Sequence, residues 1–307
     1  MSITIEAGRR EVEISRPDKP LFPSGITKAD LAGYYERIAA TMLHHISGRP
    51  LNLERYPDGI ERQRIMQQRA SDYFPSWIGR AEVPGRDHPV VHVVATEPAT
   101  LVYLAGQACV TLHQWLSRRD RLDRPDRLVI DLDPARQKPA EVRRAARIFG
   151  ALLREVGLEP RVMTTGSRGY HVVVALERRA GFDEVRGFAR ELARLAASRE
   201  PGLFTNEQRK AKREGKILID IQRNAYAHTS VAPYAVRARP DAPVATPLHW
   251  EELDDSATRA DRWTVASVPK RLERDGDPWA EIARHAQTLG RARKRLANLA
   301  AEAGPGS

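Results

Sequence analysis

Two carboxylates at the end of an apolar segment are the residues of this 307-residue chain that most directly suggest chemistry. Asp131 and Asp133 follow the run Leu128-Val129-Ile130, and Pro134 ends the segment. Because side chains alternate between the two faces of a strand, both carboxylates project from one face. Two unpaired carboxylates at that separation repel each other, and a divalent cation is the usual remedy. The pattern predicts a site for a hard cation, Mg²⁺ or Mn²⁺.

The motif alone leaves four interpretations open. The two acids could lie at a solvated sheet edge. A haloacid-dehalogenase-type phosphatase also uses D-x-D at a strand end, but that pattern usually has Thr or Val where Ala135 stands. A sugar-nucleotide transferase can carry D-x-D with Mn²⁺, yet it needs no basic surface. Nucleotidyl transfer through two metals requires a third carboxylate and phosphate-binding groups elsewhere in the chain.

Candidates for both further requirements are present. Asp220 ends a second short apolar strand that begins at Lys216. Between the two acidic strands, residues 161–165 and 170–176 read as strands joined by the turn 166–169, in which glycines flank Ser167 and Arg168. Glycines allow close approach of the backbone to a ligand, and these side chains with His171 could bind phosphate oxygens. A plain hairpin is the alternative interpretation of the turn.

Four segments together resemble a known family. They read LVIDLDP from residue 128, TTGSRGYH from 164, KAKREGKILIDIQRN from 210 and TSVAPYAVRAR from 229. Their order and spacing resemble the polymerase domain of bacterial DNA ligase D, within the archaeo-eukaryotic primase superfamily. The similarity extends from near Ile14 to Trp279, which is nearly the whole chain.

The resemblance implies roles for individual residues. The metal-binding, catalytic acids correspond to Asp131, Asp133 and Asp220. The nucleotide contacts correspond to His113, Thr165, Ser167, Arg168, His171 and Arg237. The implied DNA contacts are Lys19, Lys28, Arg55, Ile65, Met66, Arg209, Lys210, Lys212, Arg213 and Lys216.

The chain also departs from the family pattern. Ile65 and Met66 stand where a pair of Phe residues is usual, which puts base stacking in doubt. Glu54 replaces a common basic residue and should weaken a phosphate contact. Arg223 stands where a nucleotide-contacting Gln is frequent. These changes concern substrate handling and leave the metal acids intact.

The resemblance implies the activity and the partners. The expected reaction is two-metal extension of a primer 3′-hydroxyl with NTP or dNTP substrates, favouring ribonucleotides and using Mn²⁺ or Mg²⁺. The expected DNA is a gapped or broken duplex with a 5′-phosphate, in end joining or short-gap repair. A stand-alone polymerase of this kind would rely on a separate ATP-dependent DNA ligase and on Ku. The alternatives are a primase that starts chains de novo and a non-catalytic DNA-end-binding module.

Composition agrees with a polyanionic partner. The chain has 50 Lys and Arg against 40 Asp and Glu, a formal charge of +10, and a pI of about 10.0. The one cysteine, Cys109, lies in an apolar run and excludes an intramolecular disulfide, as expected in a reducing cytosol. No long apolar span or leader is visible. The expected location is cytoplasmic and nucleoid-associated, with no membrane partner.

The expected fold is α+β, with a primase-polymerase type core of mixed or antiparallel sheets flanked by helices. We expect a single catalytic domain over residues 1–303, followed by a disordered tail, 304–307. Within it we expect an N-terminal region over residues 1–110, a metal-bearing core over 111–240 and a C-terminal helical region over 241–303. The pattern predicts a short N-terminal hairpin or extended arm, a helix beginning at Thr27, helices over 139–157 and 183–198, and a basic helix beginning after Pro278.

Overall fold

The computed structural model describes residues 1–85, 88–136 and 138–302. Residue contacts divide the chain into two compact units. The first comprises residues 1–122, 229–246 and 263–277, and the second comprises 123–228, 247–262 and 278–307. The single domain over 1–303 and its three regions stay a prediction, and the predicted tail 304–307 lies outside the described residues.

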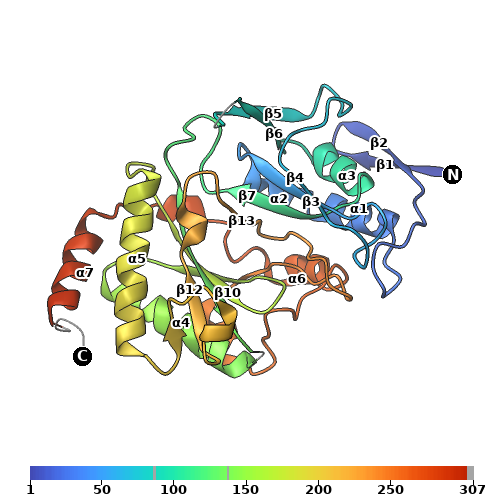
Figure 1. Cartoon of the computed structure of the whole chain (residues 1–307). Coiled ribbons are helices and arrows are strands. Elements are labelled where there is room, and N and C mark those ends of the chain that lie inside the picture. The colour runs from blue at the N-terminus through green and yellow to red at the C-terminus, as the bar shows by residue number, and fades with distance from the viewer. Residues whose placement is uncertain (86–87, 137, 303–307) are drawn as a thin grey trace. The chain divides into compact units, whose positions relative to one another are not determined.

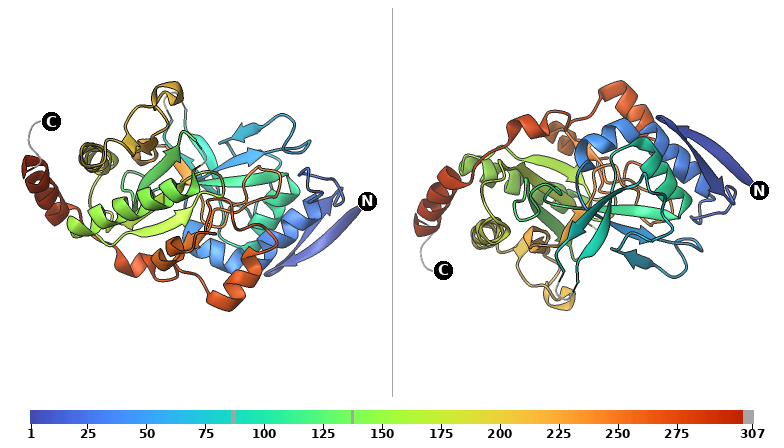
Figure 2. Two further views of the ribbon diagram at one scale, coloured as in Figure 1. Left: turned by 90° about the horizontal axis from the view of Figure 1, so that it is seen from below. Right: turned by 90° about the horizontal axis from the view of Figure 1, so that it is seen from above.

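The first unit is built on an antiparallel sheet in the order β13-β7-β3-β6-β5, with β4 also paired to β3. Of the two N-terminal alternatives, the hairpin is confirmed as β1–β2, and it packs beside α3, which in turn lies along α1 (Figures 1 and 2). The elements are β1 (Ser2–Ala7), β2 (Arg10–Ser15), α1 (Lys28–Arg37), α2 (Ala39–Ile46), β3 (Leu51–Arg55), β4 (Ile65–Gln67), β5 (Gly79–Val83), β6 (Val90–Val94), α3 (Pro98–Gly106), β7 (Cys109–Trp115), β13 (Thr229–Val231) and α6 (Val268–Asp275).

Helix α1 begins where its sequence signal predicts. The Thr27 side chain accepts a hydrogen bond from the Asp30 backbone, and the Asp30 carboxylate accepts one from the Thr27 backbone, which forms a capping box. The apolar positions Leu31, Tyr34 and Tyr35 are buried, because a spacing of three to four residues gathers them on one helix face.

The second unit is built on a sheet in the order β11-β12-β8-β10-β9-β14, in which only the β11–β12 pair is parallel. Helices α4 and α5 pack against this sheet, and α7 packs against α5 (Figure 1). The elements are β8 (Arg127–Pro134), α4 (Pro139–Glu155), β9 (Arg161–Thr164), β10 (Tyr170–Ala175), α5 (Phe182–Arg199), β11 (Phe204–Thr205), η1 (Lys210–Lys212), β12 (Ile217–Asp220), η2 (Gln222–Asn224), β14 (Pro247–Leu248), η3 (Trp250–Asp254), η4 (Ile282–His285) and α7 (Gly290–Glu302).

The two predicted helices of this unit are confirmed within two residues at each end. Pro139 occupies the first turn of α4, where its missing amide hydrogen costs nothing. Val142, Ala145, Phe149 and Leu152 follow helical spacing and are buried, so the same face of α4 covers the sheet. Their burial stabilises the helix more than its intrinsic propensity does.

The prediction for the last helix was wrong in its start. Helix α7 begins at Gly290, so Arg284 lies in the short helix η4, while the other basic residues of the predicted helix lie in α7. The physical reason is a strand-like contact that the segment between η4 and α7 makes with the end of β10. The Gln287 backbone donates to the Ala175 carbonyl at 2.9 Å and accepts from the Glu177 amide at 3.0 Å, which holds the chain extended at this position.

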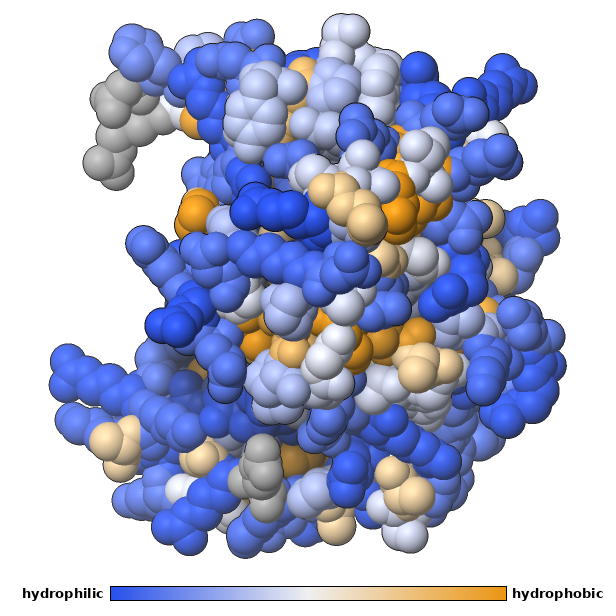
Figure 3. All heavy atoms as spheres, turned by 90° about the vertical axis from the view of Figure 1, so that its right-hand side faces the viewer, coloured by the Kyte–Doolittle hydropathy of each residue, from blue (hydrophilic) through white to orange (hydrophobic). Residues whose placement is uncertain are grey.

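The predicted fold class, α+β with mixed and antiparallel sheets flanked by helices, is confirmed. Cys109 is fully buried on β7, as expected of a small apolar side chain. On the face drawn in Figure 3, hydrophilic side chains predominate and apolar ones gather only in small groups. Among the described residues, no helix is both long enough and apolar enough to cross a membrane. The cytoplasmic location stays a prediction.

Candidate active site

Strand pairing brings the three predicted metal acids to one face of the second unit's sheet, on the neighbouring strands β8 and β12. Asp220 on β12 is the direct cross-strand partner of Asp131 on β8. Asp133 lies two residues further along β8 and therefore on the same face. Directly opposed side chains have Cβ atoms about 5 Å apart. The three carboxylates thus form one group of acids, as the sequence predicts.

Asp131 lies at the centre of this group and is almost fully buried. On its other side, His171 of β10 is also a direct cross-strand partner, with Nε2 3.6 Å from the Asp131 Oδ2 atom. The Arg223 Nε and Nη2 atoms donate to the same oxygen at 3.3 Å. Burial raises the pKa of Asp131, but the positive charges and hydrogen bonds of His171 and Arg223 outweigh it and lower the pKa to about 2.

Asp133 is held by two arginines. Arg213 Nη1 donates to the Asp133 Oδ2 atom at 2.9 Å, and Arg168 Nη2 lies 3.5 Å from Oδ1. Arg213 is itself buried and donates to the backbone carbonyls of Glu207 and Gln208. The sequence predicted Arg213 as a DNA contact and missed its contact with Asp133. Its position just before β12 could have predicted this contact, because antiparallel pairing brings that segment beside the end of β8.

Gln222 and Asn224, which follow β12, fix the position of the acids. The Asp220 Oδ1 atom accepts from the Gln222 amide at 2.8 Å, which opens the short helix η2. The fully buried Asn224 accepts from the Val129 amide at 2.8 Å and donates to the Val129 carbonyl at 2.6 Å. This pair of bonds locks η2 onto β8 next to Asp131. Sequence reasoning missed Asn224, because only the fold brings it beside Val129.

The turn between β9 and β10 is shaped by Gly169 and Thr165. A Cβ atom at Gly169 would lie 2.0 Å from the Leu132 carbonyl oxygen, so only glycine fits beside β8. The Thr165 hydroxyl donates to the Gly169 carbonyl at 3.0 Å and so closes the turn. The predicted role of Thr165 near a sugar stays a prediction.

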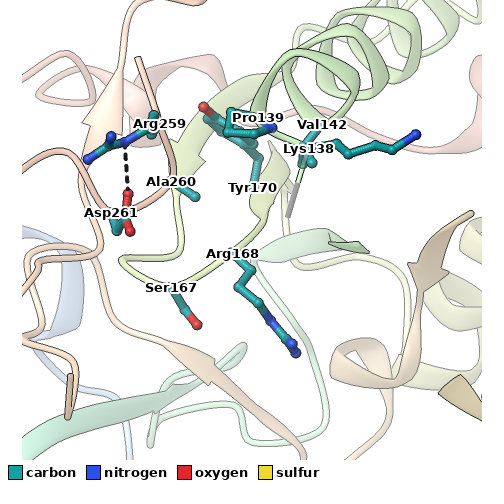
Figure 4. A pocket seen from close by; sticks show the side chains of 9 residues that line it. All are labelled: Lys138, Pro139, Val142, Ser167, Arg168, Tyr170, Arg259, Ala260 and Asp261. Carbon is teal, nitrogen blue, oxygen red and sulfur yellow. Dashed lines mark ion pairs between the residues drawn. The ribbon is translucent and has the colours of Figure 1, made fainter. Parts of the chain in front are cut away.

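Ser167 and Arg168 line a cavity of about 310 Å³. Figure 4 shows their side chains extending from the turn on one side of the cavity, with Lys138 and the first turn of α4 on another. Arg259 forms an ion pair with Asp261 across from them, at 3.4 Å. The lining is rich in cationic side chains, which suits an anionic ligand.

His113 and Arg237, the remaining predicted nucleotide contacts, belong to the first unit. The His113 Nε2 atom lies 3.0 Å from the Glu54 Oε2 atom, and the Tyr56 hydroxyl donates to Oε1 at 2.7 Å. Burial raises the pKa of Glu54, but the His113 and Tyr56 hydrogen bonds and the Arg237 charge outweigh it and lower the pKa from 4.5 to about 2. Glu54 is therefore ionised at neutral pH.

The shifted pKa of Glu54 predicts acid sensitivity. A carboxyl whose folded pKa is below its unfolded value stabilises the fold fully above about pH 4.5, and this contribution is lost as the pH falls towards 2. We expect Glu54→Gln to lose less stability than the wild type between pH 4.5 and 2. Urea unfolding at several pH values measures this. Parallel pH dependence of the two proteins would contradict it.

The predicted DNA contacts differ widely in exposure. Ile65 and Met66 on β4 are among the most exposed apolar side chains, at 42% and 47%. Arg209, Lys210 and Lys212 are exposed in and beside η1. Their DNA contacts stay predictions.

The other predicted DNA contacts are engaged within their own unit. Lys28 is buried and Lys19 pairs with Asp58 at 2.8 Å. Arg55 Nη1 donates to the Gln67 side chain at 2.8 Å, and the half-buried Lys216 lies 3.6 Å from Glu214. DNA binding by these residues requires that their present contacts rearrange.

The three carboxylates on the shared face of β8 and β12 fit a hard divalent cation, since they offer oxygen ligands. In residues 1–85, 88–136 and 138–302, no three His, Cys, Asp or Glu side chains converge on a metal position in their present rotamers. The reason is visible in the ion pairs, because Arg213 and Arg223 take up oxygens of Asp133 and Asp131. Asp131, Asp133 and Asp220 would hold the cations once these arginines turn away.

Comparison with known proteins agrees with this geometry. Residues 27–279 match the family described as "LigD, primase-polymerase domain". The multifunctional non-homologous end joining protein LigD of Pseudomonas aeruginosa is 35% identical over 297 residues, which cover 92% of this chain and 34% of that protein. The LigD protein of Mycobacterium tuberculosis H37Rv is 33% identical over 281 residues, 88% of this chain and 37% of that protein. The chain therefore spans about a third of the length of these relatives.

A solved structure extends the similarity to the fold. The polymerase domain of Mycobacterium tuberculosis Ligase D in complex with DNA matches with a TM-score of 0.84 at 30% identity, over 90% of this chain and 99% of that one. The resemblance inferred from the four sequence segments is confirmed. The chain belongs to the LigD primase-polymerase domain family of nucleotidyltransferases.

Proposed function

We propose that this chain extends the 3′-hydroxyl of a primer or gap terminus by metal-dependent nucleotidyl transfer during repair of broken or gapped DNA. The observation that carries the proposal is the cross-strand pairing of Asp131 with Asp220, with Asp133 on the same face. Two-metal nucleotidyl transfer needs such a cluster, because carboxylates close together on one face can hold two cations side by side. Family membership supports the same reaction class.

Different residues of the second unit bind the metals and the phosphates in this proposal. Asp131, Asp133 and Asp220 would hold two divalent cations, Mn²⁺ or Mg²⁺, which would supply Lewis acidity to the attacking hydroxyl and to the triphosphate. Ser167 and Arg168 donate hydrogen bonds to phosphate oxygens, where negative charge grows as the bond to the leaving group breaks.

We propose that His171, besides its predicted contact with the nucleotide, positions Asp131. Its imidazole lies against the Asp131 carboxylate, and it orients that carboxylate for metal binding. His113 and Arg237 of the first unit are further proposed contacts of the nucleotide. They add positive charge that suits a triphosphate.

The proposed polymer substrate is DNA with a short gap or a broken end that bears a 5′-phosphate. The structural relative is described in complex with DNA, and the curated relatives are named for non-homologous end joining. The net charge of +10 favours a polyanion. Exposed Ile65 and Met66 offer apolar contact to a base in place of aromatic stacking. We propose ribonucleotides as the favoured substrates, and a DNA ligase and Ku as partners in the same repair reaction.

The test is incorporation on a short-gapped duplex with a 5′-phosphate, supplied with Mn²⁺ or Mg²⁺ and with either ribo- or deoxynucleotides. Extension in the presence of either cation supports the proposal and reports the sugar preference in the same gel. A parallel reaction on unprimed template detects synthesis that starts de novo. Absence of extension on gapped, recessed and unprimed DNA, together with retained DNA binding, would favour a non-catalytic end-binding module.

A further inference from the structure

One face of the first unit's sheet carries a row of polar side chains on β3 and β7. Asn52 lies opposite His113, and Glu54 lies opposite Thr111. Asn52 and Thr111 are buried, and within the described residues the Asn52 Oδ1 and Thr111 Oγ1 atoms have no hydrogen-bond partner. Buried polar atoms are seldom left unpaired, because each one costs free energy. These two unpaired atoms make this face of the sheet polar beside Glu54 and His113.

Glu54 is the one anion in this row, and it is surrounded by basic side chains and a tyrosine hydroxyl. Its carboxylate lies 3.0 Å from the His113 Nε2 atom and 3.7 Å from the Arg64 Nη1 atom. The Arg237 charge also acts on it, and the Tyr56 hydroxyl donates to it. Only 9% of its side chain is exposed. A buried carboxylate in this setting is fixed in place as well as charged.

A carboxylate and a phosphate compete for the same donors. Imidazolium and guanidinium groups bind both through charged hydrogen bonds of similar geometry. The His113 Nε2 atom carries one proton at most, so it cannot donate fully to Glu54 and to a phosphate oxygen at once. Glu54 also repels any phosphate held near His113 and Arg237, and at partial burial this repulsion is only incompletely screened.

We propose that Glu54 is an internal counter-anion that competes with the triphosphate of the incoming nucleotide for His113, and so sets the affinity of this chain for nucleotides. The proposal rests on the function proposed above, in which His113 contacts the nucleotide. Glu54 touches no reacting atom in this scheme. It determines the affinity for the nucleotide, and its removal changes binding more than turnover.

Inorganic tripolyphosphate is the probe, because it presents the phosphate chain without base or sugar. Its dissociation constant is measured by titration calorimetry on the full chain at neutral pH and fixed ionic strength. Glu54→Gln removes the charge and keeps one of the two acceptor oxygens, so we expect it to bind tripolyphosphate about tenfold more tightly than the wild type. Glu54→Asp keeps the charge and should stay within about twofold of the wild type.

A matched control separates this local effect from net charge. Glu82→Gln removes the same charge from an exposed position on β5 of the same sheet, and it should leave the dissociation constant unchanged. An unchanged or weaker affinity of Glu54→Gln, or an equal gain in Glu82→Gln, would overturn the proposal. Failure of both the wild type and Glu54→Gln to bind tripolyphosphate would overturn it as well.

A measurement on the wild type covers the case in which Glu54→Gln does not fold. Tripolyphosphate should shift the ¹⁵N resonance of the His113 Nε2 atom as the bond to Glu54 is replaced, and an unmoved resonance at saturation contradicts the proposal. The kinetics of nucleotide incorporation separates the proposed function from the proposed role of Glu54. If the wild type incorporates no nucleotide, the proposed function fails while tighter tripolyphosphate binding by Glu54→Gln still stands. If the wild type is active, Glu54→Gln should lower KM about tenfold with kcat within twofold.

Discussion

Asp131→Asn is expected to lower nucleotide incorporation by about 10³-fold or more. Asn keeps the shape of the side chain but removes the charge that would hold two cations, and loss of several kcal/mol of transition-state stabilisation corresponds to about this factor. Asp131 is also the centre of the acidic group, paired across strands with both Asp220 and His171. Single-turnover extension of a gapped duplex measures the effect.

The DNA affinity of Asp131→Asn should stay within about twofold of the wild type, since the phosphate contacts of bound DNA come from basic side chains. Fluorescence anisotropy with a labelled gapped duplex checks this. Asp241→Asn, an exposed Asp of the first unit, is the control for the same chemical change and should retain full activity. If Asp131→Asn retained a tenth of the wild-type rate, the carboxylate would not hold the cations.

Gly169→Ala is expected to destabilise the protein by roughly 3 kcal/mol, the upper end of the cost of overpacking, and to abolish most incorporation. The new Cβ atom would lie 2.0 Å from the Leu132 carbonyl oxygen, which is backbone and cannot rotate away. The turn must therefore shift away from β8. That shift moves Ser167, Arg168 and His171 relative to the acids.

Gly187→Ala is the matched control for this substitution. Gly187 lies within α5, and a Cβ atom there would meet nothing within 4 Å. Replacing a glycine in a helix by alanine should stabilise the protein by up to about 1 kcal/mol. Urea unfolding and gap extension of the two variants test the contrast. Equal stability of Gly169→Ala and the wild type would show that the turn is more adaptable than its contact with Leu132 implies.

The two predictions depend on different properties of one strand. Asp131 contributes charge, while Gly169 allows the β9–β10 turn to approach β8. Asn224 adds a third requirement, because its hydrogen bonds to Val129 hold η2 beside the same strand. The function proposed for the chain thus depends on how closely the β9–β10 turn and η2 can pack against β8.

Local sequence was sufficient to predict the elements that carry the site. The apolar run before Asp131 predicted a strand. Because side chains alternate along a strand, Asp131 and Asp133 were then expected on one face. Pro139 and the spacing of Val142, Ala145 and Phe149 predicted α4 for equally local reasons. The start of the last helix was predicted wrongly, because the contact of Gln287 with Ala175 is not local.

Tertiary structure alone decided which charges meet. Arg213 read as a DNA contact and Arg223 as the replacement of a nucleotide-contacting Gln, yet they lie against Asp133 and Asp131. Glu54 read as a lost phosphate contact, yet it holds His113. Strand and helix patterns depend on neighbours a few residues apart, whereas these ion pairs depend on sheet register between segments far apart in the chain. The sequence by itself therefore determined the acids and the strands that present them, and the fold determined their counter-ions.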